Sequence, residues 1–462
     1  MKKPFLRNLA LILVLSLAIS CLSACSVPGN TTTTEAPTKA PTEVSTETPA
    51  EESTEAPTEA APIPVPELPA DSPLASLPDY TYDSYKALWD VENGAEILLF
   101  NASSSDGYTS YLTDLENAGF TKYAENEIVG NLYSTWTNDD LHVTMMHIPS
   151  QKSTRILAEP STLGLPTRAE DNVYTDAGVE NVVVQIGTNY DGQQGNGMCY
   201  AYRLCDGSFI LVDSGFNSSQ CADAIYETLV KLAPDPENIV IAAWFVTHQH
   251  GDHIGGFYAF ATKYASKVQL DQVIYNYPTE KIFQLCDSSV NHITKLPQHA
   301  AMFEGCELVE AHPGQEFYIR DAYIEMLYTW DMYNKSSITF MNNTSLVFTV
   351  TINDTKAIML GDCGPLASPI VTKAYGDYIK SDYIQVAHHG YTGATVELNQ
   401  LIDADVIMWP AAKTTYLGHI ADACHKIFIG AENLYIADTS ATLIPLPFDK
   451  EKVEIWELYG NN

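Results

Sequence analysis

The sequence predicts an α/β protein in which short strands alternate with helices, preceded by a smaller α+β domain. Short apolar runs, typical of buried strands, recur between residues 182 and 446. Segments with helical spacing, such as 219–232, separate these runs. A cluster of histidines and aspartates at 248–253 directly follows the strand-like run 239–246. Such side chains are poor core material, so their place at a strand end indicates a functional site.

Residues 1–25 have the features of a targeting segment. Three basic residues fall within the first seven positions, and the apolar core 9–20 is shorter than the ~20 residues that span a membrane. The tetrapeptide Leu22–Cys25 resembles a bacterial lipobox, where cleavage leaves Cys25 as the N-terminal residue that carries the lipid. We expect a lipoprotein on the bacterial cell surface, lipid-anchored through Cys25 to the outer face of the cytoplasmic membrane. An ordinary secretory cleavage site is the alternative.

Residues 26–78 are dominated by Thr, Glu, Pro and Ala. A segment with so few large apolar side chains cannot offset the entropy that is lost on ordering. Proline and mutually repelling glutamates also keep such a chain extended. We therefore predict a disordered stalk that lifts the folded part off the membrane.

The formal net charge is −34, and the sequence contains no basic stripe. Proteins that bind nucleic acid through its phosphates normally carry such a stripe, so we expect no broad nucleic-acid surface. A metal-centred site acting on one phosphate remains compatible with this charge, because bound divalent ions dominate the field around them.

Residues 79–165 are predicted to form a small α+β domain, whose role the sequence leaves open. Its predicted elements are strands at 95–101, 130–137 and 142–148 and a helix at 108–118. His142 and His147 lie an odd number of positions apart on one strand. They are therefore expected to face opposite sides and not to share a metal.

The main domain is predicted over 175–462. Its strands are expected at 182–187, 198–205, 209–213, 239–246, 346–352, 357–360, 383–387, 406–409, 434–437 and 443–446. Helices are expected at 219–232 and directly after Asp252, where Phe257, Phe260 and Ala261 have helical spacing.

Four side chains of the 248–253 run suit a metal site. Neutral imidazole and carboxylate are ligands that zinc, manganese and iron accept. His248 and His250 lie two positions apart, so an extended turn lets both reach one ion. Asp252 and His253 are adjacent and diverge, which suits a second ion beside the first.

The pattern His-x-His-x-Asp-His after an apolar strand resembles the signature of the metallo-β-lactamase fold superfamily. Three further segments resemble that family: 207–215, which ends in Asp213-Ser214-Gly215, then 358–362 and 383–390. Together these motifs cover roughly residues 180 to 450. The resemblance implies an αββα sandwich in which the motifs meet at one edge, between the two sheets.

The resemblance also implies two divalent metal ions about 3.5 to 4 Å apart with a hydroxide between them. Zinc is expected, with manganese or iron as alternatives. The implied ligands are His248 and His250 for the first ion, Asp252, His253 and one of His388 or His389 for the second, and Asp362 as the bridge between both.

The assignment of the last histidine rests on its neighbour. His389 directly precedes Gly390, where a tight turn can aim it inward, so we assign it as the ligand. His388 then faces the substrate, either as proton donor to the leaving group or as support for the ligands. The opposite assignment stays open.

The first ion needs a third ligand. One candidate is His312, because His292 and His299 lie in a polar segment expected at the surface. The segment Asn342–Ser345 resembles the Asn-x-Ser strand start of a branch found in bacterial DNA-uptake channel proteins and phosphorylcholine esterases. In that branch an Asn or Ser stands where others place His, which implies a weakly held first ion. The residues expected to contact the substrate or support the ligands are Asp213, Asn343, Ser345 and Tyr391, the last in place of the branch's usual serine.

These features predict an extracytoplasmic metal-dependent hydrolase, most favourably a phosphodiesterase or phosphoesterase. Asp252 is expected to orient a hydroxide between the metals, with His388 opposite the leaving group. The expected substrate is a phosphoester, either a small molecule or part of an envelope polymer. Two alternatives remain: an inactive lipoprotein module that binds envelope polymers, and a lactam or lactone hydrolase, which the missing Gly-His motif disfavours.

Overall fold

The structure of the protein, a computed structural model, describes residues 62–91, 94–101, 103–190, 196–278, 295–333 and 340–459. The predicted targeting segment, the lipid site at Cys25 and the stalk as far as residue 61 lie outside these ranges. Across the described ranges, no helix combines the length and the apolar character that crossing a membrane requires.

The predicted stalk ends before residue 78. Residues 62–78 belong to the described structure, where Leu74 is buried and Tyr85 N donates a 2.8 Å hydrogen bond to Ile63 O. Leu74 lies in the apolar core of the first sheet, and Val65 packs against that core. The prediction of disorder over 62–78 is therefore wrong, because its few apolar side chains find a core to join.

Six antiparallel strands form the first sheet, in the order β1-β2-β6-β5-β4-β3. They are β1 (Ser84–Asp90), β2 (Glu96–Asn101), β3 (Thr121–Ile128), β4 (Asn131–Thr137), β5 (Leu141–Ile148) and β6 (Ser153–Pro160). Helix α1 (Ser105–Asn117) begins after Ser104, whose side chain accepts a hydrogen bond from Gly107 N. Tyr111 and Leu115 of α1 share one apolar core with the sheet.

The main fold contains two larger sheets. The nine-stranded sheet holds β7 (Val182–Ile186), β8 (Cys199–Arg203), β9 (Phe209–Asp213), β10 (Ile239–Phe245), β11 (Val268–Leu270), β12 (Gln272–Tyr275), β13 (Glu307–Glu310), β21 (Ser440–Pro445) and β22 (Glu454–Glu457). The seven-stranded sheet holds β14 (Glu316–Ile319), β15 (Ala322–Tyr328), β16 (Val347–Ile352), β17 (Thr355–Met359), β18 (Tyr383–Gln385), β19 (Val406–Trp409) and β20 (Asn433–Ile436).

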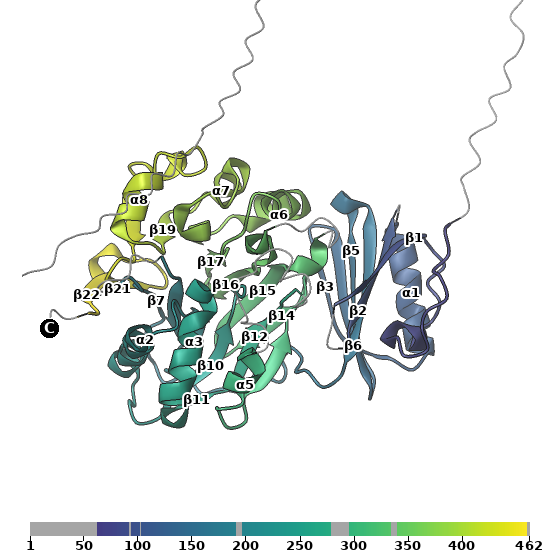
Figure 1. Ribbon diagram of the computed structural model, residues 1–462, viewed down its shortest axis with the longest axis horizontal. Helices are drawn as coiled ribbons and strands as arrows, with labels where there is room; N and C mark the ends of the chain where they lie inside the picture. Colours follow the sequence, from purple (N-terminus) through teal and green to yellow (C-terminus); the bar gives the residue numbers. More distant parts are fainter. Residues whose placement is uncertain are drawn as a thin grey trace, which may run out of the picture. The chain divides into compact units, whose positions relative to one another are not determined.

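The two larger sheets pack face to face, with helices outside. Phe245 of β10 and Phe348 of β16 stack at 4.7 Å between ring centroids within one core. Helices α2 (Ser219–Leu232), α3 (Gly251–Tyr264) and α5 (Leu296–Ala300) pack on the nine-stranded sheet, and α6 (Ser368–Tyr375) and α7 (Val396–Ile402) on the other (Figure 1). A further helix, α8 (Lys413–His419), follows β19. The expected αββα sandwich, preceded by a small α+β unit, is therefore present.

Parallel strand pairs bring the motifs to one edge. Strands β9 and β10 are parallel, so Asp213 at the end of β9 lies beside the loop that follows β10. Strands β17 and β18 are also parallel, which brings Asp362 and the His388-His389 pair to the same edge of their sheet. The carboxyl ends of parallel strands are the usual place for a site in α/β proteins.

Helix α3 must approach the end of β9 closely, and Gly256 permits this approach. A Cβ at Gly256 would lie 1.9 Å from Ser214 O, whereas a Cβ at Gly418 in α8 would meet nothing within 4 Å. We expect Gly256→Ala to lower the free energy of unfolding by about 3 kcal/mol, the upper end of the usual cost of overpacking, because the backbone must shift. The matched change Gly418→Ala is expected to raise it by ~0.5 to 1 kcal/mol. Denaturant unfolding of both variants checks this, and equal effects would contradict the packing argument.

Candidate metal centre

The loop after β10 is fixed by a buried carboxylate. Asp213 accepts hydrogen bonds from Thr247 N and Thr247 Oγ1, both at 2.7 Å. Its Oδ2 also lies 2.6 Å from His253 Nδ1. A carboxylate on Nδ1 keeps the proton there, so the free Nε2 of His253 points toward the site. Asp213 is wholly buried, so its place is behind the histidine and away from any substrate.

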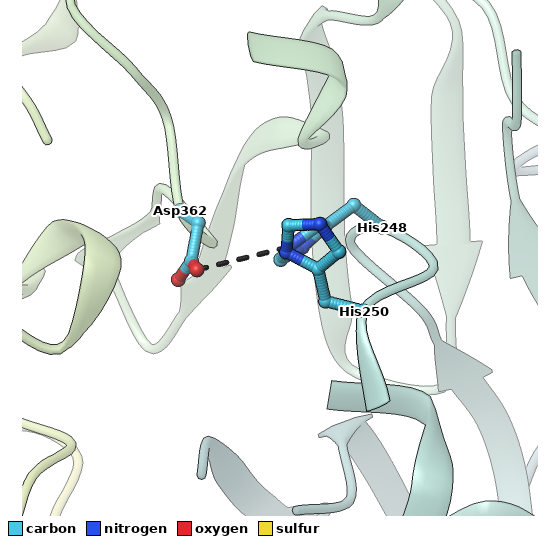
Figure 2. Close-up of side chains that lie close together, drawn as sticks. All are labelled: His248, His250 and Asp362. Carbon is cyan, nitrogen blue, oxygen red and sulfur yellow. Dashed lines mark hydrogen bonds and ion pairs between the residues drawn. The ribbon is translucent and has the colours of Figure 1, made fainter. Parts of the chain in front are cut away.

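The first group of candidate ligands is His248, His250 and Asp362 (Figure 2). Their ligand atoms all lie within 4.8 Å of one another. His248 Nε2 is 3.7 Å from Asp362 Oδ2 and 3.0 Å from His250 Nδ1. His250 sits at the N-cap of α3, where extended backbone turns into helix.

The second group is Asp252, His253 and His389, with ligand atoms again within 4.8 Å of one another. The Nε2 atoms of His253 and His389 face each other at 3.1 Å. His389 Nε2 also lies 3.4 Å from Asp252 Oδ2. Asp252 is in the first turn of α3, where the helix dipole favours a carboxylate.

Asp362 lies between the two groups. Its Oδ2 faces His248, and its Oδ1 lies 3.1 Å from His253 Nε2 and 3.5 Å from His389 Nε2. Oδ1 is buried and makes no hydrogen bond within the described structure. Imidazole nitrogens that converge on a buried carboxylate fit divalent cations, since neutral imidazole and ionised carboxylate both offer lone pairs to the same space.

The protonation states of His248 and Asp362 suit metal binding, whereas at His253 and His389 burial is outweighed by the surrounding carboxylates, which raise the pKa of both imidazoles. Burial, and then the nearby His253 and His250, hold the pKa of His248 well below its usual value, so this imidazole is neutral at pH 7. Burial alone would raise the pKa of the Asp362 carboxyl, but His253 and His389 outweigh it and hold that pKa well below its usual range. Neutral imidazole and ionised carboxylate are the forms that bind metals.

The two consecutive histidines, His388 and His389, have different surroundings in the structure. His389 is buried, belongs to the second group, and its Nδ1 lies 2.9 Å from Pro410 O. His388 is 20% exposed, and its Nε2 is 4.0 Å from Asp362 Oδ2. Gly390 turns at φ +84°, and a Cβ there would meet the Trp409 ring at 2.1 Å. His389 thus lies where a ligand is needed, and His388 lines the open side.

His312 lies outside both groups, which corrects its expected role as a ligand. Its Nδ1 is 2.9 Å from Asp331 Oδ2, and its Nε2 is 3.3 Å from Glu159 Oε1 of the first sheet. Both ring nitrogens are therefore engaged by carboxylates. Burial lowers the pKa of His312, but Glu159 and Asp331 outweigh it and raise that pKa well above its usual value.

The expected supporting residues divide into two kinds. Ser345 Oγ accepts a 3.0 Å hydrogen bond from Asp362 N, so it holds a candidate ligand. Tyr391 is 36% exposed, its ring centroid is 5.6 Å from that of His388, and its hydroxyl accepts a hydrogen bond from Asn196. Asn343 accepts hydrogen bonds from two backbone N–H groups after Asp362, so of its two expected roles it takes the supporting one.

The sequence reasoning named the segment of Asn342 but assigned roles only to Asn343 and Ser345. In the structure the Nδ2 of Asn342 lies 3.3 Å from Asp362 Oδ2, and its side chain is buried. The signal in the sequence was the segment Asn342–Ser345 itself, which resembles a branch that places an Asn or Ser where others place His.

Residues 192–319 match the family model of the Metallo-beta-lactamase superfamily, a region that includes the His248–His253 motif. This part of the chain is therefore similar to domains of that superfamily, whose members are mostly metal-dependent hydrolases. A search of curated proteins found no match.

Three of the solved structures that resemble this chain have low sequence identity to it and low TM-scores. The metallo-beta-lactamase fold protein YhfI from Bacillus subtilis has 12% identity and a TM-score of 0.35, over 60% of this chain and 100% of that chain. Human tRNase Z, short form, has 14% identity and a TM-score of 0.31, over 50% and 92%. Unliganded yeast PDE1 has 11% identity and a TM-score of 0.34, over 56% and 98%.

The setting of His312 predicts a structural effect with a defined pH dependence. We expect His312→Gln to lower the free energy of unfolding by ~3 to 5 kcal/mol, because it leaves buried carboxylates without their cation. The folded-state pKa of His312 is raised, so its stabilisation is complete below the unfolded-state pKa and is lost as pH rises through the folded-state pKa. The difference in the free energy of unfolding between His312→Gln and the parent should therefore narrow above pH 7. Denaturant unfolding from pH 6 upward measures it.

His299→Gln is the matched control, since His299 is partly exposed and its Nδ1 contacts only the backbone oxygen of Lys295. Metal content is expected to equal that of the parent in both variants. A His312→Gln protein that folds normally but binds less metal would restore His312 as a ligand.

Proposed function

We propose that this protein is a metal-dependent phosphodiesterase or phosphoesterase that acts outside the cytoplasm. The observation that carries the proposal is the buried Asp362 carboxylate between His248 on one side and His253 and His389 on the other. We propose zinc in both positions, with manganese or iron as alternatives, because these ions accept imidazole and carboxylate. His248 and His250 would hold one ion, Asp252, His253 and His389 the other, and Asp362 both.

Bound ions would supply Lewis acidity, lowering the pKa of a water toward neutrality and neutralising charge on phosphoryl oxygens. The protein's own groups then position the reactants. Asp252 is partly exposed. Burial raises its carboxyl pKa, but the hydrogen bond from His389 and the charges of His253 and His389 together outweigh burial and hold that pKa below its usual value. As an ionised acceptor, Asp252 can hold the attacking water by its hydrogen.

His388 is suited to the leaving group. Its Nδ1 lies 2.8 Å from Thr392 O, which fixes a proton on that nitrogen and leaves Nε2 facing the site. A second proton on Nε2 can then pass to the leaving oxygen. Two exposed rings, Phe340 and Tyr391, lie within 6.0 Å of the His388 ring between centroids, and they offer apolar contact to that side of a substrate.

The location and partners belong to the same proposal. Lys2, Lys3, the apolar core and Cys25 support export and attachment to the membrane by a lipid. The substrate is then a phosphoester outside the cell, either a small molecule or part of an envelope polymer. The net charge of −34 supports a local site and argues against a broad nucleic-acid surface.

We expect the full-length protein, purified in detergent, to contain two transition-metal equivalents and to hydrolyse bis(p-nitrophenyl) phosphate. Asp362→Ala should reduce the rate by more than the about 10- to 100-fold that follows loss of a group behind a ligand, since both metal positions lose a donor. Elemental analysis and release of p-nitrophenol are the measurements. Asp377→Ala, which removes an exposed carboxylate, is the matched control and should act like the parent.

A set of three substrates, together with the metal content, separates a phosphodiesterase from a lactam hydrolase and from an inactive binding module. p-Nitrophenyl phosphorylcholine and a penicillin-type lactam are tested beside the diester. Turnover of the lactam alone would replace the proposal with a lactam hydrolase. A protein without transition metal after gentle purification would be an inactive binding module, and an Asp362→Ala protein as active as the parent would show that the site is wrongly assigned.

A further inference from the structure

The two candidate metal positions differ in the number of side chains that can donate to an ion. Besides the shared Asp362, the second has Asp252, His253 and His389, whereas the first has only His248 and His250. No other histidine, cysteine, aspartate or glutamate of the described ranges joins the first group. Tetrahedral sites are completed by four donors. The first position therefore lacks one donor that the second has.

Asn342 lies beside the shared carboxylate, on its first-position side. It is 1% exposed, and its Nδ2 approaches Asp362 Oδ2, the oxygen that faces His248. Its Oδ1 is buried and has no hydrogen-bond partner in the described structure. A buried acceptor without a partner costs about 1 to 3 kcal/mol, so an amide kept in this state calls for an explanation.

A bound cation would explain why the Asn342 side-chain oxygen is buried without a hydrogen-bond partner. Amide carbonyl oxygen is a hard, neutral ligand for divalent ions. The nitrogen and oxygen ends of the Asn342 amide exchange places by a half-turn about its last torsion, which has a broad energy minimum. The oxygen can thus occupy the place beside Asp362 that the nitrogen takes, at the loss of one long 3.3 Å hydrogen bond.

The neighbours of Asn342 fix its backbone. The 3-10 turn Met341–Thr344 holds it, Asn343 accepts hydrogen bonds from Leu366 N and Ala367 N, and Tyr328 Oη donates to Asn343 O at 2.6 Å. The turn is therefore anchored by its other members, and the Asn342 side chain is left free for the site.

We propose that the side-chain oxygen of Asn342 completes the first metal position, in place of a third histidine. This inference rests on the proposed function, because it requires metals at both positions. The first position then carries one carboxylate fewer than the second, so it binds its ion more weakly. An aspartate at position 342 would supply that charge and tighten it.

The test is calorimetric titration of chelator-stripped, full-length protein with Mn²⁺ and, separately, Zn²⁺. The parent is expected to bind two equivalents with distinct dissociation constants. Asn342→Ala should keep the tight equivalent and weaken the other by at least the ~10-fold that marks loss of a partner at a metal site. Asn342→Asp should bind two equivalents, and its weaker equivalent should bind more tightly than the weaker equivalent of the parent. With Mn²⁺, the electron paramagnetic resonance signal of a coupled pair should be lost in Asn342→Ala and present in Asn342→Asp.

Two controls separate a ligand from a structural residue. Asn196→Ala truncates an asparagine that contacts Tyr391 Oη and Ala412 N but neither ligand group, and it should bind metal like the parent. Metal-free Asn342→Leu should unfold no more easily than the metal-free parent, because leucine removes the unpaired carbonyl.

The outcomes are distinct. If the parent binds two ions and Asn342→Ala binds both with unchanged constants, the inference is overturned and the proposed function stands. If Asn342→Asp also loses an ion, or metal-free Asn342→Leu is destabilised, Asn342 is structural and the inference is overturned. A parent that binds no ion overturns the proposed function and the inference together.

Discussion

The buried carboxylate of Asp362 is the constraint around which the site is built. Its two oxygens face different histidines, so any shift of this side chain changes both groups of candidate ligands at once. A carboxylate removed from water is stable only when positive charge or hydrogen bonds surround it. Ser345 fixes its backbone and Asn342 touches its side chain, while Asp213 fixes His253 from behind. The neighbouring loops therefore serve to hold one ionised group in a fixed place.

The sequence revealed the parts of the site that follow from local rules. His248 to His253 and Asp362 each follow a strongly apolar strand, and parallel pairing brings such strand ends together. The choice of His389 over His388 followed from the turn at Gly390, where φ is +84°. The αββα layers followed from the order of strands and helices. Two strands of the first sheet were harder to find, because β1 and β3 lack a clean alternation of buried and exposed residues.

What the sequence could not supply depends on tertiary contacts. His312 pairs with Glu159, which lies 153 residues earlier in another sheet, and no local pattern indicates that contact. Of the consecutive residues Asn342 and Asn343, only one meets Asp362, and a 3-10 turn decides which. Residues 62–78 have the composition of a stalk, yet Leu74 finds a core. Each of these errors arose where a distant partner overrode a local tendency.

The large negative charge of the protein constrains what such a site can recognise. A phosphoester is itself an anion, and a chain of net charge −34 repels it at long range when salt is low. Screening over about 8 Å at physiological ionic strength removes most of that repulsion until the substrate is near the site. In the proposed function, attraction would come from bound cations and from His388, within reach of one phosphoryl group. Affinity for the reacting phosphate would then depend on metal occupancy, and the first position, which we propose binds its ion more weakly, would set the metal concentration at which the protein can act.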